Sequence, residues 1–142
     1  MTLFTSDNVL VPIDFSKESQ QALSDTLAFV KDPAKLHVIH VLRPLESTEP
    51  GSLWQTVDDA TRVDHVKATF YKAFPDEAYQ QAQFTVKVGN PSAEIIDYAE
   101  EHAIDLIVIP SNGRTGLPRF FLGSVAARVV RFAQCPVLVI RK

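Results

Sequence analysis

Short runs of apolar, largely β-branched residues recur along the chain and constrain its fold more than any other feature. The runs cover residues 9–13, 36–41, 84–88, 106–109 and 137–140. The first and fourth show no alternation between apolar and polar positions, which is the pattern of strands that are covered on both faces. We therefore predict five strands in a buried sheet.

Between these runs the sequence has the residue spacing of amphipathic helices. Helices are predicted over residues 16–31, 53–74, 91–102 and 124–133, and the second has the weakest periodicity. Asn90 and Pro91 are typical of a helix start, with Asn90 as the N-cap. The residues expected to face inward are Ala22, Leu23, Leu27, Val30, Val57, Ala60, Val63, Val66, Phe70, Ile95, Ile96, Ala99, Val125, Val129, Phe132 and Ala133.

The alternation of strands and helices predicts the class of fold. It implies right-handed βαβ crossovers and an open, five-stranded parallel sheet with helices on both faces, an α/β architecture of the Rossmann-like kind. The chain has 142 residues, of which 46% are apolar. This length and composition lead us to expect a single domain, residues 1–142, with a substantial core.

Net charge and the lengths of the apolar runs argue against several classes of function. The formal net charge is −3, so the chain has no overall positive field that would attract nucleic acid or an anionic membrane. No apolar run approaches the roughly 20 residues of a membrane-spanning helix, and residues 1–8 lack the pattern of an export signal. We expect a cytoplasmic protein with neither nucleic acid nor membrane as a partner.

Cysteine and histidine residues do not indicate a metal or catalytic site. Cys135 is the only cysteine, which excludes an intramolecular disulfide and a zinc site with several cysteines. His37 and His40 are three residues apart on a predicted strand, so they face opposite sides and cannot share a metal ion. No catalytic or metal-binding residue is assigned, and the histidines are expected at the surface or satisfied within the core.

Ligands of open α/β sheets bind outside the carboxyl ends of the strands, where the strand order reverses. This rule selects three segments of the sequence. They are residues 12–16 after the first strand, 41–42 after the second and 110–124 after the fourth.

The third segment concentrates the glycines of the chain. Three of the five, Gly113, Gly116 and Gly123, fall within eleven residues. Gly123 and Ser124 open a predicted helix, whose free N–H groups and positive dipole end favour an anion. Arg114 and Arg119 add cationic donors, so the segment has the features of a phosphate cradle. The alternative is a tight loop in which Ser124 is an ordinary N-cap.

These residues resemble the universal stress proteins. The resemblance rests on Gly113-Arg114-Thr115-Gly116, the apolar segment 117–122, Gly123-Ser124 and the stretch 135–139. It extends over essentially the whole chain, because residues 11–16, the Gly89-x-Pro91 turn and residues 105–108 also match.

The resemblance implies a nucleotide site. In the ATP-binding branch of the family, glycines corresponding to Gly113 and Gly123, with Ser124, hold the phosphates. Asp14 and Val41 would lie against adenine and ribose. The ligand implied is ATP, with AMP or ADP as alternatives and Mg²⁺ as a companion ion. The residues expected to bind it are Pro12, Asp14, Val41, Ile109, Gly113, Arg114, Gly116, Gly123, Ser124 and Val125, the last through its backbone.

Two positions leave alternatives open. The first glycine of the family motif is replaced by Pro110, which has no N–H and carries a ring where the family allows close approach. Asp14 could contact the ligand, or it could cap the helix that follows, a role that Ser16 could fill instead.

Two functions follow from these features. The first is a nucleotide-responsive stress or regulatory protein that binds ATP across the carboxyl ends of the first and fourth strands and hydrolyses it slowly at most. The sequence contains no Gly-Lys-Ser/Thr P-loop and no dinucleotide fingerprint. The second is a dimeric interaction protein that binds no nucleotide. Both predict a homodimer through residues 137–140, because a short apolar edge strand invites pairing across a two-fold axis.

Overall fold

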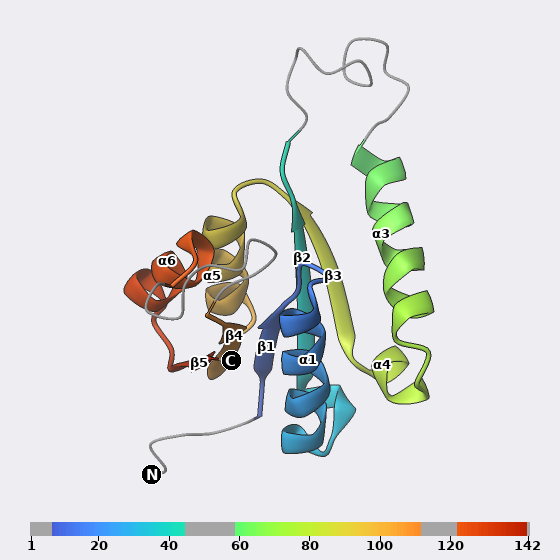
Figure 1. Cartoon of the computed structure of the whole chain (residues 1–142), viewed down its shortest axis with the longest axis horizontal. Helices are drawn as coiled ribbons and strands as arrows, with labels where there is room; N and C mark the ends of the chain where they lie inside the picture. Colours follow the sequence, from blue (N-terminus) through green and yellow to red (C-terminus); the bar gives the residue numbers. More distant parts are fainter. Residues whose placement is uncertain (1–6, 45–58, 112–121, 142) are drawn as a thin grey trace.

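The computed structural model describes residues 7–44, 59–111 and 122–141, and within these ranges five strands form one parallel sheet (Figure 1). Its order is β3-β2-β1-β4-β5. This arrangement confirms the predicted α/β class. The strands are β1 (Val9–Pro12), β2 (Leu36–Leu42), β3 (Gln83–Val88), β4 (Leu106–Pro110) and β5 (Val137–Ile140).

Helices connect successive strands and cover both faces of the sheet. They are α1 (Lys17–Val30), the short 3₁₀ helix η1 (Pro33–Lys35), α3 (Asp59–Ala73), α4 (Glu77–Gln81), α5 (Pro91–Glu101) and α6 (Ser124–Phe132). Asn90 caps α5 by accepting from the Ala93 amide, as predicted. The helix α4 was not predicted, because its five residues are too few to show an apolar period. Residues 53–58 of the second predicted helix lie outside the described ranges.

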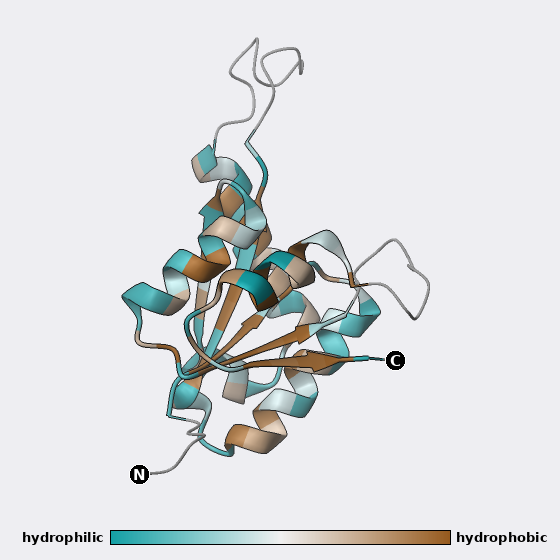
Figure 2. Cartoon of the chain, turned by 90° about the vertical axis from the view of Figure 1, so that its left-hand side faces the viewer, coloured by the Kyte–Doolittle hydropathy of each residue, from teal (hydrophilic) through white to brown (hydrophobic). Residues whose placement is uncertain are grey.

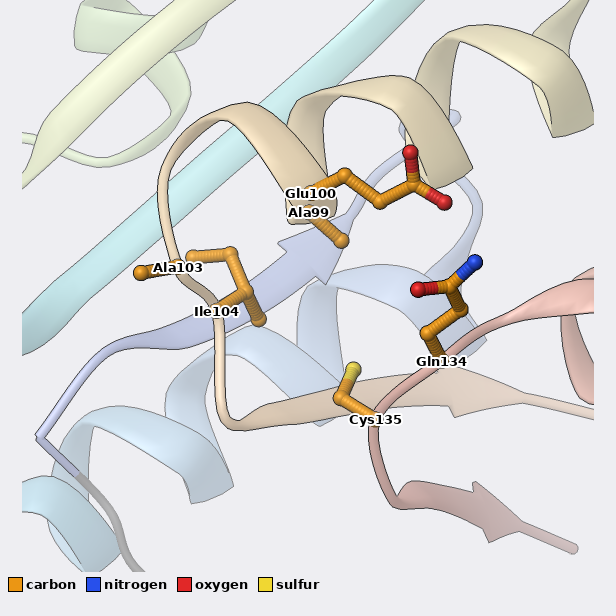
Figure 3. Close-up of a pocket in the computed structure, with 6 residues that line it drawn as sticks. All are labelled: Ala99, Glu100, Ala103, Ile104, Gln134 and Cys135. Carbon is orange, nitrogen blue, oxygen red and sulfur yellow. The ribbon is translucent and has the colours of Figure 1, made fainter.

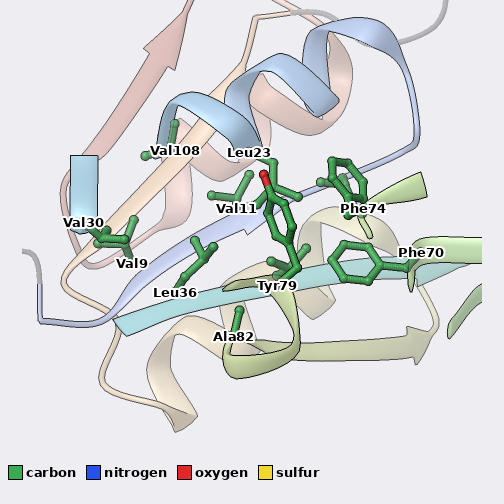
Figure 4. Close-up of a cluster of buried hydrophobic side chains, with 12 residues drawn as sticks. Val9, Val11, Leu23, Val30, Leu36, Phe70, Phe74, Tyr79, Ala82 and Val108 are labelled. Carbon is green, nitrogen blue, oxygen red and sulfur yellow. The ribbon is translucent and has the colours of Figure 1, made fainter. Parts of the chain in front are cut away.

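On one face of the sheet, α1, α3 and α4 enclose an apolar cluster (Figure 4). Val9 and Val11 of β1 and Leu23 of α1 are fully buried in it. Phe70 of α3 is also fully buried, and its ring stacks on Phe84 of β3 with a centroid distance of 4.0 Å and an interplanar angle of 9°. This stacked pair fastens α3 to the edge strand β3.

On the opposite face, α5 and α6 enclose a second apolar cluster. Leu10 and Ile107, from the adjacent central strands β1 and β4, contribute to it together with Tyr98 of α5 and Val129 of α6. Colouring by hydropathy shows the apolar residues concentrated on the strands between the two helical layers (Figure 2). The strands are therefore buried from both sides, as their unbroken apolar runs predicted.

One predicted inward residue of α6 is instead exposed. Phe132 has 53% of its surface exposed, and the Arg131 guanidinium lies 5.2 Å from its ring centroid. The buried face of α6 runs through Ala126 and Val129, and Phe132 follows at the border of that face in the last residue of the helix. Apolar spacing alone could not show where the covering sheet ends.

A polar network crosses the second cluster at the amino-terminal ends of the strands. The His37 ring of β2 lies 2.7 Å through Nδ1 from the Tyr98 hydroxyl and 3.2 Å through Nε2 from Asn8 Oδ1. Because an amide oxygen can only accept, Nε2 donates to Asn8 and Nδ1 accepts from Tyr98. Burial, and secondly the nearby His102, lower the pKa of His37 below its ordinary value of 6.5. His37 is thus a satisfied core histidine, one of the two roles expected for it.

We expect Phe70→Ala to destabilise the protein by about 3–5 kcal/mol, because it removes a fully buried ring and leaves a cavity between α3 and β3. Urea denaturation measures the change. Phe29→Ala is the matched control: Phe29 is 58% exposed on α1, so its loss should change stability by no more than about 0.5 kcal/mol. Equal effects of the two substitutions would contradict the assignment of Phe70 to the core.

Stability should fall as the pH drops below about 6.5, because His37 binds its proton more readily in the unfolded chain than in the folded one. Urea midpoints compared at about pH 7.5 and about pH 5.5 measure this dependence. In His37→Gln the dependence should become shallower. His65→Gln, which removes an exposed imidazole from α3, is the control and should leave the wild-type slope in place. An unchanged slope in His37→Gln would show that His37 does not carry the effect.

Candidate functional site

The strand order reverses between β1 and β4, and this is where the sheet opens at its carboxyl edge. Hydrogen-bonded pairing of these two strands covers Val9↔Leu106 and Leu10↔Ile107. Each strand continues to pair with its outer neighbour, as far as Pro12↔Ile39 for β1 and Pro110↔Ile140 for β4. The ladder between β1 and β4 therefore ends before the strands do, as expected at the crevice of an open α/β sheet.

The turn from β1 into α1 follows directly after the end of β1 at this switch point. Asp14 Oδ1 accepts from the Ser16 amide at 2.9 Å, and the Asp14 amide donates to Ser19 Oγ at 3.3 Å. The hydroxyl of Ser16 caps α1 by accepting from the Ser19 amide at 3.1 Å. Of the two alternatives for the helix cap, the structure selects Ser16, and Asp14 braces the turn instead.

The same turn holds a residue in an unfavourable backbone conformation. Phe15 has φ of 63°, and a left-handed conformation costs a residue with a side chain roughly 1–2 kcal/mol. Within the described ranges, the other non-glycine residues with positive φ, Lys31 and Ala103, follow the ends of α1 and α5. Gln20 stabilises the turn by donating from Nε2 to the Phe15 carbonyl at 2.9 Å. Strain of this kind is retained only where the surrounding structure enforces it.

Three of the predicted site residues from three different elements reach the second apolar cluster. Ile109 of β4 is 4% exposed and belongs to it, while Val41 of β2 and Val125 of α6 are half-buried against it. The fold thus brings Val41 and Val125, which are 84 positions apart in the sequence, to the same apolar cluster. Pro12 is buried at the end of β1, beside Ile39.

The amino terminus of α6 is tied to the carboxyl end of β4, the other strand at this switch point. Gly123 is its N-cap with φ −60° and ψ 157°, and within the described residues it makes no side-chain cap, whereas the N-cap residues of α1, η1, α4 and α5 each provide one. Ser124 is the first helical residue, so the alternative that made it the N-cap is wrong. The first turn of α6 contains no acidic residue. The amides of a first helical turn and the positive end of the helix dipole favour an anion.

Hydrogen bonds of Ser111 hold this helix start against the sheet. The Ser111 carbonyl accepts from the Gly123 amide at 2.6 Å, and the Ser111 amide donates to the Ile140 carbonyl at 2.8 Å. Ser111 is 6% exposed. The helix terminus is thus tied to the ends of both β4 and β5.

Pro110 occupies a position of β4 at which the sheet requires no hydrogen bond from the backbone N–H. The amides of Ile107 and Ser111 both point to β5, where they donate to the Pro136 and Ile140 carbonyls. Successive residues of a strand alternate their backbone groups between neighbours, so position 110 faces β1. There the ladder has already ended. The proline leaves the sheet intact, and it removes an N–H from the edge of the crevice.

Three predicted phosphate-binding residues, Gly113, Arg114 and Gly116, lie outside the described residues, as does Arg119. The structure therefore describes only the part of the predicted site that comes from β1 and the turn after it, β2, β4 and the start of α6.

One residue near the crevice was not predicted as part of it. The His40 ring of β2 lies with Nδ1 2.7 Å from the Ile13 carbonyl oxygen, and it packs edge-on against Phe15. The sequence signal was its position next to Val41 at the end of a strand. That position predicts only a surface or core histidine, because nothing in the sequence shows which backbone group a side chain will contact.

A separate hollow of about 270 Å³ opens at the opposite, amino-terminal edge of the sheet (Figure 3). It lies between the end of α5 and the turn before β5. Burial, and secondly the charge of Asp105, raise the pKa of the Cys135 thiol above its ordinary value, which disfavours the nucleophilic thiolate. The lining residues are Ala99, Glu100, Ala103, Ile104, Gln134 and Cys135.

The described part of the chain contains no group of three or more His, Cys, Asp or Glu side chains placed to hold a metal ion. No helix in these ranges combines the length and apolar character needed to cross a membrane.

Comparison with known proteins identifies a family. The model of the universal stress protein family matches residues 5–141. Universal stress protein MJ0531 of Methanocaldococcus jannaschii is 31% identical over 138 residues, which cover 94% of this chain and 81% of the relative. The solved structure of MJ0577, from the same organism, has a TM-score of 0.77 and 27% identity, and the match covers 96% of each chain.

Two more distant solved structures share the fold and contain nucleotides. One is a universal stress protein family protein from Arabidopsis thaliana with AMP bound, with a TM-score of 0.62, 20% identity and coverage of 95% of this chain and 91% of the other. The second is a universal stress protein in complex with cAMP, with a TM-score of 0.57, 21% identity and coverage of 96% and 97%.

Proposed function

Because this chain belongs to the universal stress protein family, we propose that it binds an adenine nucleotide across the carboxyl ends of β1 and β4 and acts as a nucleotide-responsive stress or regulatory protein. The observation that carries the proposal is the start of α6: its N-cap Gly123 makes no side-chain cap among the described residues and is bonded to the end of β4, where the β1–β4 ladder has ended. We place the protein in the cytoplasm as a single domain.

The phosphates would lie at the start of α6. Amides of the first helical turn, among them those of Ser124 and Val125, can donate to phosphate oxygens, and the Ser124 hydroxyl is a further donor. No carboxylate in the first turn opposes an anion. Gly113, Arg114 and Gly116 are proposed to complete the phosphate site from the segment before Gly123.

The nucleoside would lie towards β1 and β2. Half-buried Val41 would offer apolar surface to an adenine ring above the buried Ile109, and Pro12 at the end of β1 and Asp14 in the turn after it would lie on the other side of the base. A carboxylate such as Asp14 accepts hydrogen bonds from ribose hydroxyls or from the adenine amino group. The adenine nucleotides in two fold relatives support this class of ligand. We propose ATP, with AMP or ADP as alternatives and Mg²⁺ as its companion ion.

We propose binding rather than efficient turnover as the function. The sequence lacks the lysine-containing P-loop that neutralises the transferring phosphate in fast nucleotidases. Any hydrolysis of ATP should then be slow, and occupancy of the site would act by changing the surface that the protein offers to partners.

A second candidate function is a dimeric interaction protein without a nucleotide. Pro110 supports it, because this residue removes an N–H from the crevice at the position of the first glycine of the family motif. The loss falls on the edge of the site next to β1, whereas the start of α6 retains its amides. We therefore favour nucleotide binding.

Under either function we propose a homodimer through the edge strand β5. Leu138 of β5 is 52% exposed, and Val130 and Phe132 at the end of α6 are 45% and 53% exposed. These three residues place exposed apolar surface on β5 and on the helix that packs against it. An edge strand with apolar neighbours can pair with a second copy of itself across a two-fold axis.

Titration calorimetry should detect ATP binding to the wild type, and Gly123→Asp should weaken it by more than about tenfold, because the new carboxylate lies beside the phosphates. Asp is also a good N-cap, so Gly123→Asp should unfold at the same temperature or slightly higher, which separates lost binding from lost folding.

Gly123→Asn is the matched control, since it has nearly the same shape without the charge. It should lose less affinity than Gly123→Asp. Equal losses of ATP affinity in the two variants would show that the new negative charge at the helix start does not cause the weaker binding. If the wild type produces no heat with millimolar ATP and no thermal shift, nucleotide binding is wrong and the second candidate function is favoured; at 100 times Kd the expected stabilisation is about 2.7 kcal/mol.

Leu138→Lys should convert the dimer to a monomer in light scattering, because a charged side chain would be buried in the paired edge. Phe29→Lys is the control, since Phe29 is a similarly exposed apolar residue on α1, and it should remain a dimer. A dimer of unchanged affinity in Leu138→Lys would exclude β5 as the interface.

A further inference from the structure

The His40 imidazole lies beneath the β1–α1 turn, on the other side of β2 from the predicted ligand contact Val41. Neighbouring residues of a strand point to opposite faces, and Val41 packs against the cluster of α5 and α6. His40 instead contacts the turn after β1, through the Ile13 carbonyl and the Phe15 ring. It therefore contacts the turn that carries Asp14 from the side opposite Val41.

The hydrogen bond from His40 to Ile13 has a defined direction. A carbonyl oxygen can only accept, so Nδ1 carries the hydrogen and donates over the 2.7 Å separation. Ile13 is 4% exposed and follows the last residue of β1. Its amide donates to the Ile39 carbonyl at 2.8 Å. The main chain of Ile13 is thus held on its amide side by the backbone of β2 and on its carbonyl side by the side chain of His40.

His40 also supports the strained residue on the other side of Asp14. The rings of His40 and Phe15 are 5.0 Å apart between centroids and meet at 60°. Phe15 has the positive φ described above, and such a conformation persists only where its surroundings enforce it. One imidazole therefore contacts the residues immediately before and after Asp14.

We propose that His40 is a positioning residue for the nucleoside half of the site: it holds Ile13 and Phe15 so that Asp14 stays where it can accept from the ribose or base. The inference rests on the proposed nucleotide function and deepens it. His40 acts through Asp14 and contacts no part of the phosphate site at the start of α6 among the described residues. Its loss should weaken recognition of the nucleoside and spare recognition of the phosphates.

Two substitutions separate the hydrogen bond from the bulk of the ring. In His40→Asn, the side-chain NH₂ can take the place of Nδ1 and donate to Ile13, whereas His40→Leu fills the space without a donor. His65→Leu, at an exposed position of α3, is the control for loss of a histidine. Thermal unfolding of each variant establishes that it is folded before binding is measured.

The binding experiment compares AMP with inorganic tripolyphosphate, which has no nucleoside. His40→Leu should lose at least about tenfold in affinity for AMP and less than about twofold for tripolyphosphate, and His40→Asn should recover most of the AMP affinity. A general loss of structure would instead lower the affinity for both ligands to a similar degree.

A measurement without ligand tests the same positioning role. Hydrogen exchange of the Ser16 amide, which donates to Asp14 Oδ1, should become faster in His40→Leu and stay near the wild-type rate in His40→Asn. His65→Leu should leave this exchange rate unchanged.

The outcomes distinguish this inference from the proposed function. If the wild type binds AMP and His40→Leu binds it equally well, with unchanged Ser16 exchange, His40 is not a positioning residue and the nucleotide function stands. If His40→Leu loses affinity for both ligands to the same degree, the role of His40 is structural and the inference is overturned. If the wild type binds neither ligand, the proposed function fails and the inference fails with it.

Discussion

The early end of the hydrogen-bond ladder between β1 and β4 is the constraint on which the proposed site depends. Parallel strands place all their carboxyl ends at one edge of the sheet, and the chain turns in opposite directions from β1 and β4 to cover opposite faces. Because the ladder ends at Leu10↔Ile107, the connections that follow the two strands separate. The turn that carries Asp14 follows β1, and the start of α6 is tied to the end of β4. Both segments are held by the same sheet.

The two segments are stabilised in different ways, which suits the two halves of a nucleotide. The β1–α1 turn is held by side chains: Ser19 and Gln20 from α1 contact its backbone, and His40 reaches it from β2. The start of α6 is held by the backbone hydrogen bond from Gly123 to Ser111, and its N-cap residue makes no side-chain cap. A turn braced by side chains can orient a carboxylate toward a sugar or base, while exposed amides favour a phosphate. Pro110 lies at the end of β4, and its nitrogen, which carries no hydrogen, faces β1.

Much of the fold was predictable because a strand that is buried on both faces has an unbroken run of apolar residues in the sequence. The unbroken apolar runs of β1 and β4 identified the central strands, and Asn90 with Pro91 located the start of α5. Phe132 shows where this reasoning fails: its spacing matches the buried face of α6, but the helix ends at the border of the covered area. For the candidate site, the family motif indicated the glycines and Ser124, whereas the capping role of Ser16 and the contact of His40 with Ile13 depend on side-chain directions that no motif records.

The amino-acid sequence by itself determined the class of fold, the family and the positions at which an anion and a nucleoside are expected, because these properties follow from residue type and local spacing. The tertiary structure decided which alternatives hold: Ser16 rather than Asp14 caps α1, Gly123 rather than Ser124 caps α6, and His37 and His40 take different roles on opposite faces of β2. The physical reason is that a hydrogen bond needs both partners within about 3 Å in a suitable direction. For residues distant in the sequence, such as His40 and Ile13, only the packing of strands and helices brings the partners together.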